Sequence, residues 1–203
     1  MRWRNYYLLI LSLLLVTGCG RSSPAFTDDF SNPDSGWGGA STEPYLRGYH
    51  SGKYQIRIDV PEWFIWTLGG HSYQDVSATV TVYSEGDPDN HYGLICRASE
   101  AGFYYFAISA DGYYAIFRYT EDGELLPLTG PAMLRSPAIR QQADNQLLAL
   151  CQESTLTLYV NGELVAQIED EALSAGDVGM AAGTLPNSAA SLAWFDDLQV
   201  SQP

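Results

Sequence analysis

The chain has 203 residues, and its 24 Asp and Glu outnumber its 10 Lys and Arg to give a formal charge of −14. An acidic surface repels phosphate backbones, so the composition excludes a nucleic-acid-binding protein, which needs basic patches. The same charge repels anionic lipid headgroups, so attachment to a membrane requires an acyl chain rather than electrostatic attraction.

Residues 1–18 have the pattern of an export signal. Arg2 and Arg4 precede an apolar run over residues 8–16, and small residues follow that run. The run is too short to cross a hydrocarbon core of about 30 Å, so we do not expect it to be a permanent transmembrane helix.

Cys19 follows this segment directly. The stretch Leu15-Val16-Thr17-Gly18-Cys19 resembles the lipobox of bacterial lipoproteins. The resemblance implies that the Cys19 thiol receives a diacylglyceryl group and becomes the mature N-terminus. A plain secretory signal with an incidental cysteine is the alternative. We therefore expect a protein of the bacterial cell envelope, anchored by lipid to a membrane on its extracytoplasmic side.

The rest of the chain is expected to be one domain. Removal of residues 1–18 takes away two Arg and no acid, which leaves eight basic and 24 acidic side chains and a formal charge of −16. The remaining length suits a single β-sandwich. We expect a lipidated cysteine and short tether over 19–26 and the sandwich domain over 27–203.

From residue 28 onward the pattern is strand and turn, with little helix. Segments rich in β-branched and aromatic residues alternate with turn clusters such as Ala110-Asp111-Gly112 and Asn161-Gly162. This pattern predicts an all-β fold, an antiparallel β-sandwich of about a dozen strands, in which only 170–175 suits a helical turn. The expected strands are 53–60, 62–68, 74–84, 91–98, 102–109, 113–119, 124–128, 146–152, 154–160, 163–168, 177–183 and 191–200.

Two cysteines remain in the domain. Cys96 and Cys151 both lie in apolar, strand-like runs. In an oxidising compartment two such thiols are a candidate disulfide, provided that their strands are neighbours. The alternative is two buried free thiols, since cysteine packs well as a small apolar residue.

Several strand and hairpin motifs follow one another along the domain: Tyr92-Gly93-Leu94-Ile95-Cys96-Arg97, Phe103-Tyr104-Tyr105-Phe106-Ala107-Ile108-Ser109, Asp111-Gly112-Tyr113-Tyr114, Leu156-Thr157-Leu158-Tyr159-Val160-Asn161-Gly162 and Phe195-Asp196-Asp197-Leu198. In this order they resemble the concanavalin A-like lectin/glucanase superfamily, more narrowly its LamG-like and DUF1080-like jelly rolls. The resemblance implies two curved sheets with a ligand groove on or beside the concave one. It implies no particular activity, because such folds carry both enzymes and binding modules.

The chain lacks the catalytic motif that this resemblance would imply. Glycosidases of the superfamily carry Glu-x-Asp-x-x-Glu on one strand, and the nearest match, 85–90, ends in Asn90 and has the composition of a turn. The three histidines share no metal-ligand spacing. A sugar hydrolase with a divergent site, of 3-keto-glycosides or glucanase-like, stays open if two carboxylates such as Glu100 and Asp111 converge.

Aromatic side chains are better represented than catalytic ones. On a strand, alternate residues share a face, so one face of each aromatic run is expected in the core and the other on a platform that stacks sugar rings. The alternative is that these aromatics only pack the two sheets. The candidate ligand-binding residues are Trp63, Trp66, Tyr104, Tyr105, Tyr113 and Tyr114, with Arg97 and Arg118 as a clamp for a polar ligand.

A structural calcium ion is a further expectation from the resemblance, between the first and last strands of the sandwich. Asp29 and Asp196, or their neighbours Asp28 and Asp197, would supply the oxygen ligands. The alternative is that these carboxylates only border two paired strands. No cofactor is expected to be required.

The sequence therefore predicts a lipid-anchored, extracytoplasmic recognition or adhesion module that binds carbohydrate through an aromatic concave face and is not catalytic. Its expected partners are the membrane, through acylated Cys19, and a glycan or an envelope protein. Two other functions remain open, the divergent sugar hydrolase and a protein-binding structural lipoprotein of the envelope.

Overall fold

The computed structural model describes residues 24–203. The export signal over 1–18 and the lipidation site at Cys19 lie outside these residues. The described part is built from strands and contains no helix, and so none that could span a membrane. The strands are β1 Pro24–Asp28, β2 Ala40–Ser41, β3 Tyr45–His50, β4 Lys53–Ile58, β5 Phe64–Tyr73, β6 Val76–Gly86, β7 Asn90–Ser99, β8 Gly102–Ile108, β9 Tyr113–Thr120, β10 Leu125–Pro127, β11 Leu134–Arg135, β12 Asn145–Gln152, β13 Thr155–Val160, β14 Glu163–Glu169, β15 Gly176–Thr184 and β16 Ser191–Ser201.

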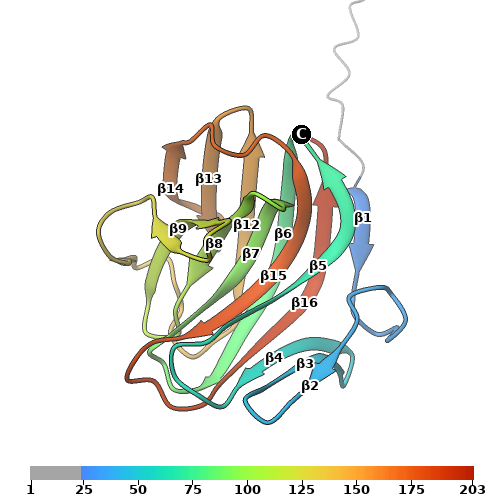
Figure 1. Ribbon diagram of the computed structural model, residues 1–203, viewed down its shortest axis with the longest axis vertical. Helices are drawn as coiled ribbons and strands as arrows, with labels where there is room; N and C mark the ends of the chain where they lie inside the picture. The colour runs from blue at the N-terminus through green and yellow to red at the C-terminus, as the bar shows by residue number, and fades with distance from the viewer. Residues whose placement is uncertain (1–23) are drawn as a thin grey trace, which may run out of the picture.

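Two antiparallel sheets stack into a sandwich (Figure 1). The nine-stranded sheet has the order β14-β13-β12-β6-β16-β4-β3-β2, with β1 beside β16. The seven-stranded sheet has the order β10-β9-β8-β7-β15-β5, with β11 beside β9. The prediction of an all-β antiparallel jelly roll is confirmed.

Each of the twelve predicted strands is present within a few residues of its expected bounds. The sequence pattern missed β1, β2, β3 and β11. Two of these have only two residues each and depend on pairing with a longer strand. Strand β1 begins at Pro24 and pairs with β16, so the segment expected to be a tether already joins the sheet there. The helical turn expected over 170–175 is a non-helical loop.

The main core lies between the sheets and follows the period of two. In β6, Val76, Ala78, Val80 and Val82 are buried while the residues between them face outward. The predicted disulfide between Cys96 and Cys151 is confirmed, with the two Cα atoms 6.8 Å apart. Because Cys96 lies on β7 and Cys151 on β12, the bond joins the two sheets covalently.

A second apolar cluster covers the outer face of the seven-stranded sheet. Every residue of β8 is buried: Tyr104 and Phe106 pack into the core between the sheets, while Phe103 and Tyr105 pack into the outer cluster. We call this second set the concave cluster. Its fully or partly buried members are Phe64, Trp66, Leu68, Ile95, Ala98, Phe103, Tyr105, Ala107, Ala115, Phe117, Tyr119, Leu125, Met133 and Ala181.

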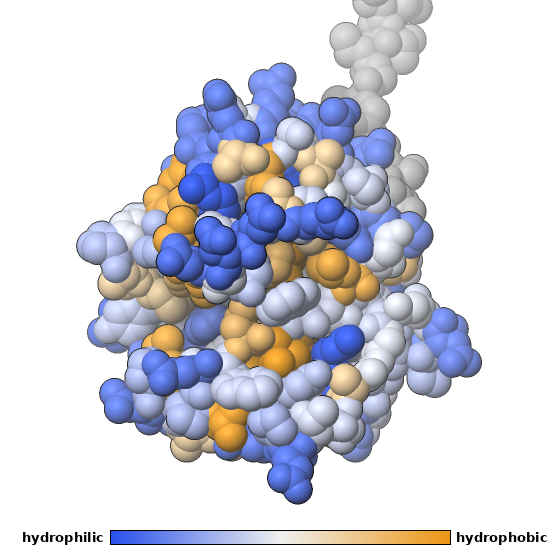
Figure 2. Space-filling model, viewed as in Figure 1, coloured by the Kyte–Doolittle hydropathy of each residue, from blue (hydrophilic) through white to orange (hydrophobic). Residues whose placement is uncertain are grey.

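The aromatic contacts show that this face is concave. The rings of Phe64 on β5 and Tyr119 on β9 have centroids 5.9 Å apart, although three strands lie between β5 and β9. In a flat sheet, four strand spacings would separate them by about 19 Å. Small residues on the intervening strands, including Ala181 and Gly93, leave room for the rings to meet. Figure 2 shows apolar atoms gathered in a hollow between hydrophilic rims.

The ends of the described chain lie at one end of the sandwich, and a group of loops lies at the other. Pro24 pairs with Ser201, so both ends of the described chain lie at one end (Figure 1). The opposite end of β16 begins at Ser191, beside Gly86. The 11 residues of β16 span about 36 Å. The loops 87–90, 109–112 and 185–190 therefore lie far from the point where the chain enters the fold.

Candidate functional site

A cavity of about 630 Å³ opens at this distal end of the concave face. Strand β9 supplies Tyr113 and Phe117, and the next strand and the loop after it supply an apolar wall. The cavity is lined by Asp89, Asn90, His91, Ser109, Asp111, Tyr113, Phe117, Leu125, Pro127, Pro131, Ala132, Met133 and Leu185. None of these residues is Lys or Arg. The cavity has an apolar side formed by 125–133 and an acidic side formed by Asp89 and Asp111.

Buried hydrogen bonds fix the polar rim of the cavity. The Asn90 amide nitrogen donates to Ser84 Oγ at 2.8 Å and to Ser191 Oγ at 3.0 Å, while its oxygen accepts from the Ala110 backbone N–H at 3.2 Å. One buried side chain thereby joins loop 109–112 to both sheets. The Ser109 hydroxyl donates to Asp111 and holds that carboxylate at the cavity.

His91 forms part of the cavity floor and is almost fully buried. Its Nδ1 lies 3.1 Å from the Tyr105 hydroxyl, and its ring packs against Phe64 and Phe117 at centroid distances of 5.6 and 6.1 Å. A Cβ on Gly183 would lie 2.2 Å from this ring, so only glycine fits beside it. Burial lowers the pKa of His91 to about 4, which keeps the imidazole neutral at neutral pH.

The depressed pKa of His91 predicts a loss of stability in acid. The unfolded chain binds a proton at this residue below a pKa of 6.5, and the folded protein binds it only below about 4. The free energy of unfolding therefore falls as the pH drops from 6.5 to 4, by about 3 kcal/mol from this residue. We expect the free energy of unfolding, measured with urea, to fall more steeply with decreasing pH for the wild type than for His91→Gln. Parallel pH profiles of the two proteins would contradict this prediction.

The structure places the predicted aromatic residues in different environments. Tyr113 lines the cavity and is half-buried. Trp66 is half-buried in the concave cluster, with its ring 5.3 Å from that of Tyr119. Trp63 is 40% exposed, but it packs beside Tyr45 outside the cavity lining. Tyr114 packs against the core between the sheets.

Tyr104 and Tyr105 are corrections to the predicted ligand-binding set, because both are fully buried. The Tyr104 hydroxyl donates to Asp170 Oδ1 at 2.6 Å, and burial raises the pKa of Tyr104 to about 12. Burial likewise raises the pKa of Tyr105 well above its usual value. Neither ring presents a face to a ligand, because the opposite sheet covers the face of β8 that carries Tyr104 and the concave cluster covers the face that carries Tyr105.

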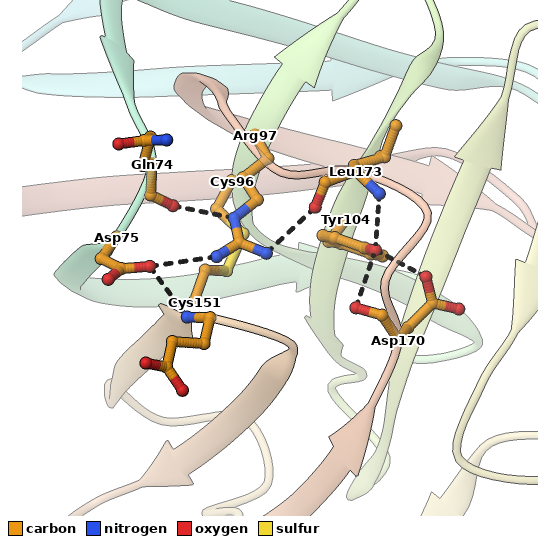
Figure 3. Close-up of a disulfide and its surroundings, with 9 residues drawn as sticks. Gln74, Asp75, Cys96, Arg97, Tyr104, Cys151, Asp170 and Leu173 are labelled. Atoms are coloured by element: carbon orange, nitrogen blue, oxygen red, sulfur yellow. Dashed lines mark hydrogen bonds and ion pairs between the residues drawn. A yellow bond between two sulfur atoms is a disulfide. The ribbon is translucent and has the colours of Figure 1, made fainter.

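Arg97 and Arg118 do not form the predicted clamp. Arg97 is 1% exposed, and its guanidinium donates to the backbone oxygens of Gln74 and Leu173 at 2.9 and 3.0 Å (Figure 3). Arg118 is paired with Asp170 at 2.7 Å. Strand β8 separates the strands of the two arginines, and both side chains fix the loop 170–174. Their role in the structure is to hold this loop.

The aspartates predicted to bind calcium are engaged with protein groups. Asp29 accepts from the Ser31 hydroxyl at 2.7 Å, which lowers its pKa, and Asp196 accepts from Lys53 Nζ at 2.6 Å. Among residues 24–203, no cluster of three or more His, Cys, Asp or Glu side chains is arranged to hold a metal. Asp28, Asp29 and Asp197 do line one cavity of about 420 Å³ where β1 pairs with β16, whereas Asp196 lies outside its lining.

Glu100 and Asp111, the carboxylates suggested for a hydrolase, do not converge. Glu100 lies in the turn before β8 and Asp111 in the turn after it. The seven residues of β8 hold the two turns about 23 Å apart. Two carboxylates this far apart cannot act on one glycosidic bond, so this pair does not meet the condition that would favour a hydrolase.

Sequence reasoning missed most of the cavity. His91, Phe117 and the wall formed by 125–133 were not predicted as site residues. Alternation along β9 could have indicated Phe117, which shares a face with Tyr113 and Tyr119. The wall carries Pro127, Gly130 and Pro131, which indicate a loop but not the surface that it covers.

Comparison with known proteins supports the fold and leaves the function open. No protein-family model matches the chain, and no curated protein matches it. Among solved structures, a Bacillus licheniformis β-glucanase is similar over 90% of this chain and 100% of its own, with a TM-score of 0.65 and 11% identity. A Bacillus subtilis protein of unknown function with a galectin-like fold is similar over 90% and 97%, with a TM-score of 0.67 and 10% identity.

The carbohydrate-binding module CBM66 from Bacillus subtilis is similar over 83% of this chain and 93% of its own, with a TM-score of 0.57 and 17% identity. The fold is a concanavalin A-like jelly roll. In this jelly roll the concave face belongs to the seven-stranded sheet, and the candidate site lies at its distal end. At these identities the likeness concerns the fold and assigns no ligand.

Proposed function

We propose that this jelly roll is a non-catalytic carbohydrate-recognition module held to a membrane of the bacterial envelope by a lipid on Cys19. The observation that carries the proposal is the cavity at the end of the concave face. It combines the half-buried ring of Tyr113 with the carboxylate of Asp111 and contains no cationic side chain.

The chemistry of the cavity suits a neutral glycan. The C–H face of a sugar ring packs on an aromatic ring, and its hydroxyls donate to carboxylates. Tyr113 and Phe117 supply the first kind of contact, and Asp89 and Asp111 supply the second. The two acids disfavour anionic sugars. The likeness to a carbohydrate-binding module and to a β-glucanase is consistent with a carbohydrate ligand.

The concave cluster leaves no place for a pair of catalytic carboxylates in the middle of the groove. Hydrolases of glycans use two carboxylates about 5–10 Å apart on either side of the bond that breaks. Over the middle of the concave face, the packed side chains of the described strands are apolar or aromatic. Aromatic packing also fills the centre of the groove, which leaves the distal cavity as the place where a sugar can enter.

The position of the cavity suits a tethered protein. A lipid on Cys19 would hold the Pro24 end of the sandwich near the membrane, while the cavity lies at the other end of β16, about 36 Å away. The site would then face away from the anchoring membrane, toward polymers of the envelope or beyond it.

The proposal predicts that Tyr113→Ala weakens glycan binding. Residues 24–203 contain every strand of both sheets, so this segment is screened on a glycan array, and hits are measured by calorimetry. Loss of one stacking ring and its contacts is expected to weaken affinity at least tenfold, or about 1.4 kcal/mol. Asp111→Asn is expected to weaken binding by a similar factor.

Tyr159→Ala is the matched control, because Tyr159 is also half-buried but faces outward from β13 in the other sheet. It should bind the glycan as the wild type does. A folded domain that binds no glycan would contradict the proposal. Release of sugar from the ligand, lost in Asp111→Asn, would instead establish a hydrolase.

A further inference from the structure

A second cavity lies on the opposite side of the sandwich, on the outer face of the nine-stranded sheet. Its volume is about 380 Å³, within the range of small-molecule sites. It is lined by His50, Ser51, Lys53, Tyr83, Glu85, Asp144 and Trp194. None of these residues belongs to the distal cavity or to the concave cluster.

Residues of β16, β6 and β3 form the floor of this second cavity. Trp194 on β16 lies directly opposite Tyr83 on β6. The neighbours of Trp194 along β16, Ala193 and Phe195, are buried in the core, so the indole points outward. Both rings are half-buried, and the imidazole of His50 lies 5.8 Å from the indole. The result is an aromatic floor open to solvent on the outer face of this sheet.

Two carboxylates stand beside this floor without a cationic partner among the ion pairs of residues 24–203. Glu85 accepts from the indole N–H of Trp194 at 3.1 Å and is exposed. Asp144 is also exposed, on the loop before β12. Neither acid takes part in the four ion pairs of this part of the chain.

Lys53 is the one cation that lines the cavity, and its charge is already balanced. Its Nζ lies 2.6 Å from Asp196 Oδ2, and this contact raises the pKa of the ammonium. The lining thus has a cation paired with Asp196 and two carboxylates, Glu85 and Asp144, outside the ion pairs. Asp144 also contributes to the raised pKa of Lys53. A carboxylate pair and an aromatic face are the two features that attract an organic cation in water.

We propose that this second cavity binds a small organic cation, such as the protonated amine of an amino sugar or a quaternary ammonium group. The cation would lie over the indole of Trp194, between Glu85 and Asp144. The inference does not depend on the proposed glycan site, because the two cavities lie on opposite sheets and share no residue.

The indole N–H signal of Trp194 provides a direct test. Residues 24–203 are labelled with ¹⁵N and titrated with glucosamine, with N-acetylglucosamine as a neutral counterpart and tetramethylammonium chloride as a quaternary cation. Sodium chloride at equal ionic strength is the control for salt. We expect saturable movement of the Trp194 signal with at least one of the two cations, and none with N-acetylglucosamine.

Two variants separate a specific site from attraction to an acidic protein. Trp194→Ala keeps the charge of the chain. It is expected to weaken the affinity for the cation, measured from the signals of neighbouring backbone amides, at least tenfold. Glu85→Gln is expected to do the same, whereas Glu163→Gln, an equal loss of charge on the exposed strand β14, should bind as the wild type.

Each result of the titration has a defined meaning. Movement with glucosamine alone identifies an amino sugar as the ligand class, and movement with tetramethylammonium alone identifies a quaternary amine. No movement with either cation overturns the proposal. An equal response to N-acetylglucosamine also overturns it, since the site would then recognise a neutral sugar. Equal weakening by Glu85→Gln and Glu163→Gln would show a nonspecific charge effect and overturn it as well.

Discussion

Replacing Cys96 and Cys151 together by alanine is expected to lower the free energy of unfolding by about 4 kcal/mol. The bond closes a loop of 55 residues, and the entropy that such a loop removes from the unfolded chain gives this value. It also joins β7 to β12, so its loss removes the one disulfide cross-link between the two sheets within the described residues. The measurement is urea unfolding of the wild type and the double variant.

The melting temperature should fall by about 8–16 °C, since each kcal/mol shifts a domain of this size by roughly 2–4 °C. Wild-type protein treated with a thiol reductant should approach the stability of the double variant. A change below about 1 kcal/mol would contradict the prediction and would mean that the reduced chain stays equally constrained.

Replacing Arg97 by methionine is expected to cost about 3–4 kcal/mol of unfolding free energy. The guanidinium is 1% exposed and donates to two backbone oxygens and to Asp75 at 3.3 Å. Removal leaves the oxygens of Gln74 and Leu173 without their charged donor in a buried place. Since Leu173 belongs to the loop 170–174, its amide should also lose protection against hydrogen exchange.

Arg57→Met is the matched control for this variant. Arg57 forms an ion pair with Asp59 in which the arginine side chain is 47% exposed. Exposed pairs of this kind contribute about 0.2–1 kcal/mol. If Arg57→Met and Arg97→Met destabilise the protein equally, the cost at Arg97 does not come from its buried hydrogen bonds.

The strands of the sandwich were predictable because burial on one face leaves a period of two in the sequence. Residues 76–82 alternate Val, Ala, Val, Val with outward-facing Ser and Thr, and the structure buries the apolar set. The short strands β2 and β11 were not predictable, because pairing with a neighbour defines them and their own two residues carry no pattern.

The candidate site was predictable only in part. Tyr113 was identified from its place in an aromatic run, and it lines the distal cavity. Tyr104 and Tyr105 belong to a similar run and are buried. Alternation places these two on opposite faces of β8 but does not report that both faces are covered. The contact between Phe64 and Tyr119 across three strands covers the second face, and it depends on sheet curvature.

The strands, the hairpin turns and the acidic charge could be read from the sequence alone, because each of these is a property of neighbouring residues or of composition. The pairing of Cys96 with Cys151, 55 residues apart, depends on their strands being neighbours and is a property of the tertiary structure. Only the tertiary structure decided which aromatic rings are open to a ligand. It placed Arg97 inside the protein, closed the middle of the concave face with rings from distant strands and left the cavity at its distal end. The physical reason is that exposure depends on how a curved sheet brings together side chains that lie far apart in the chain.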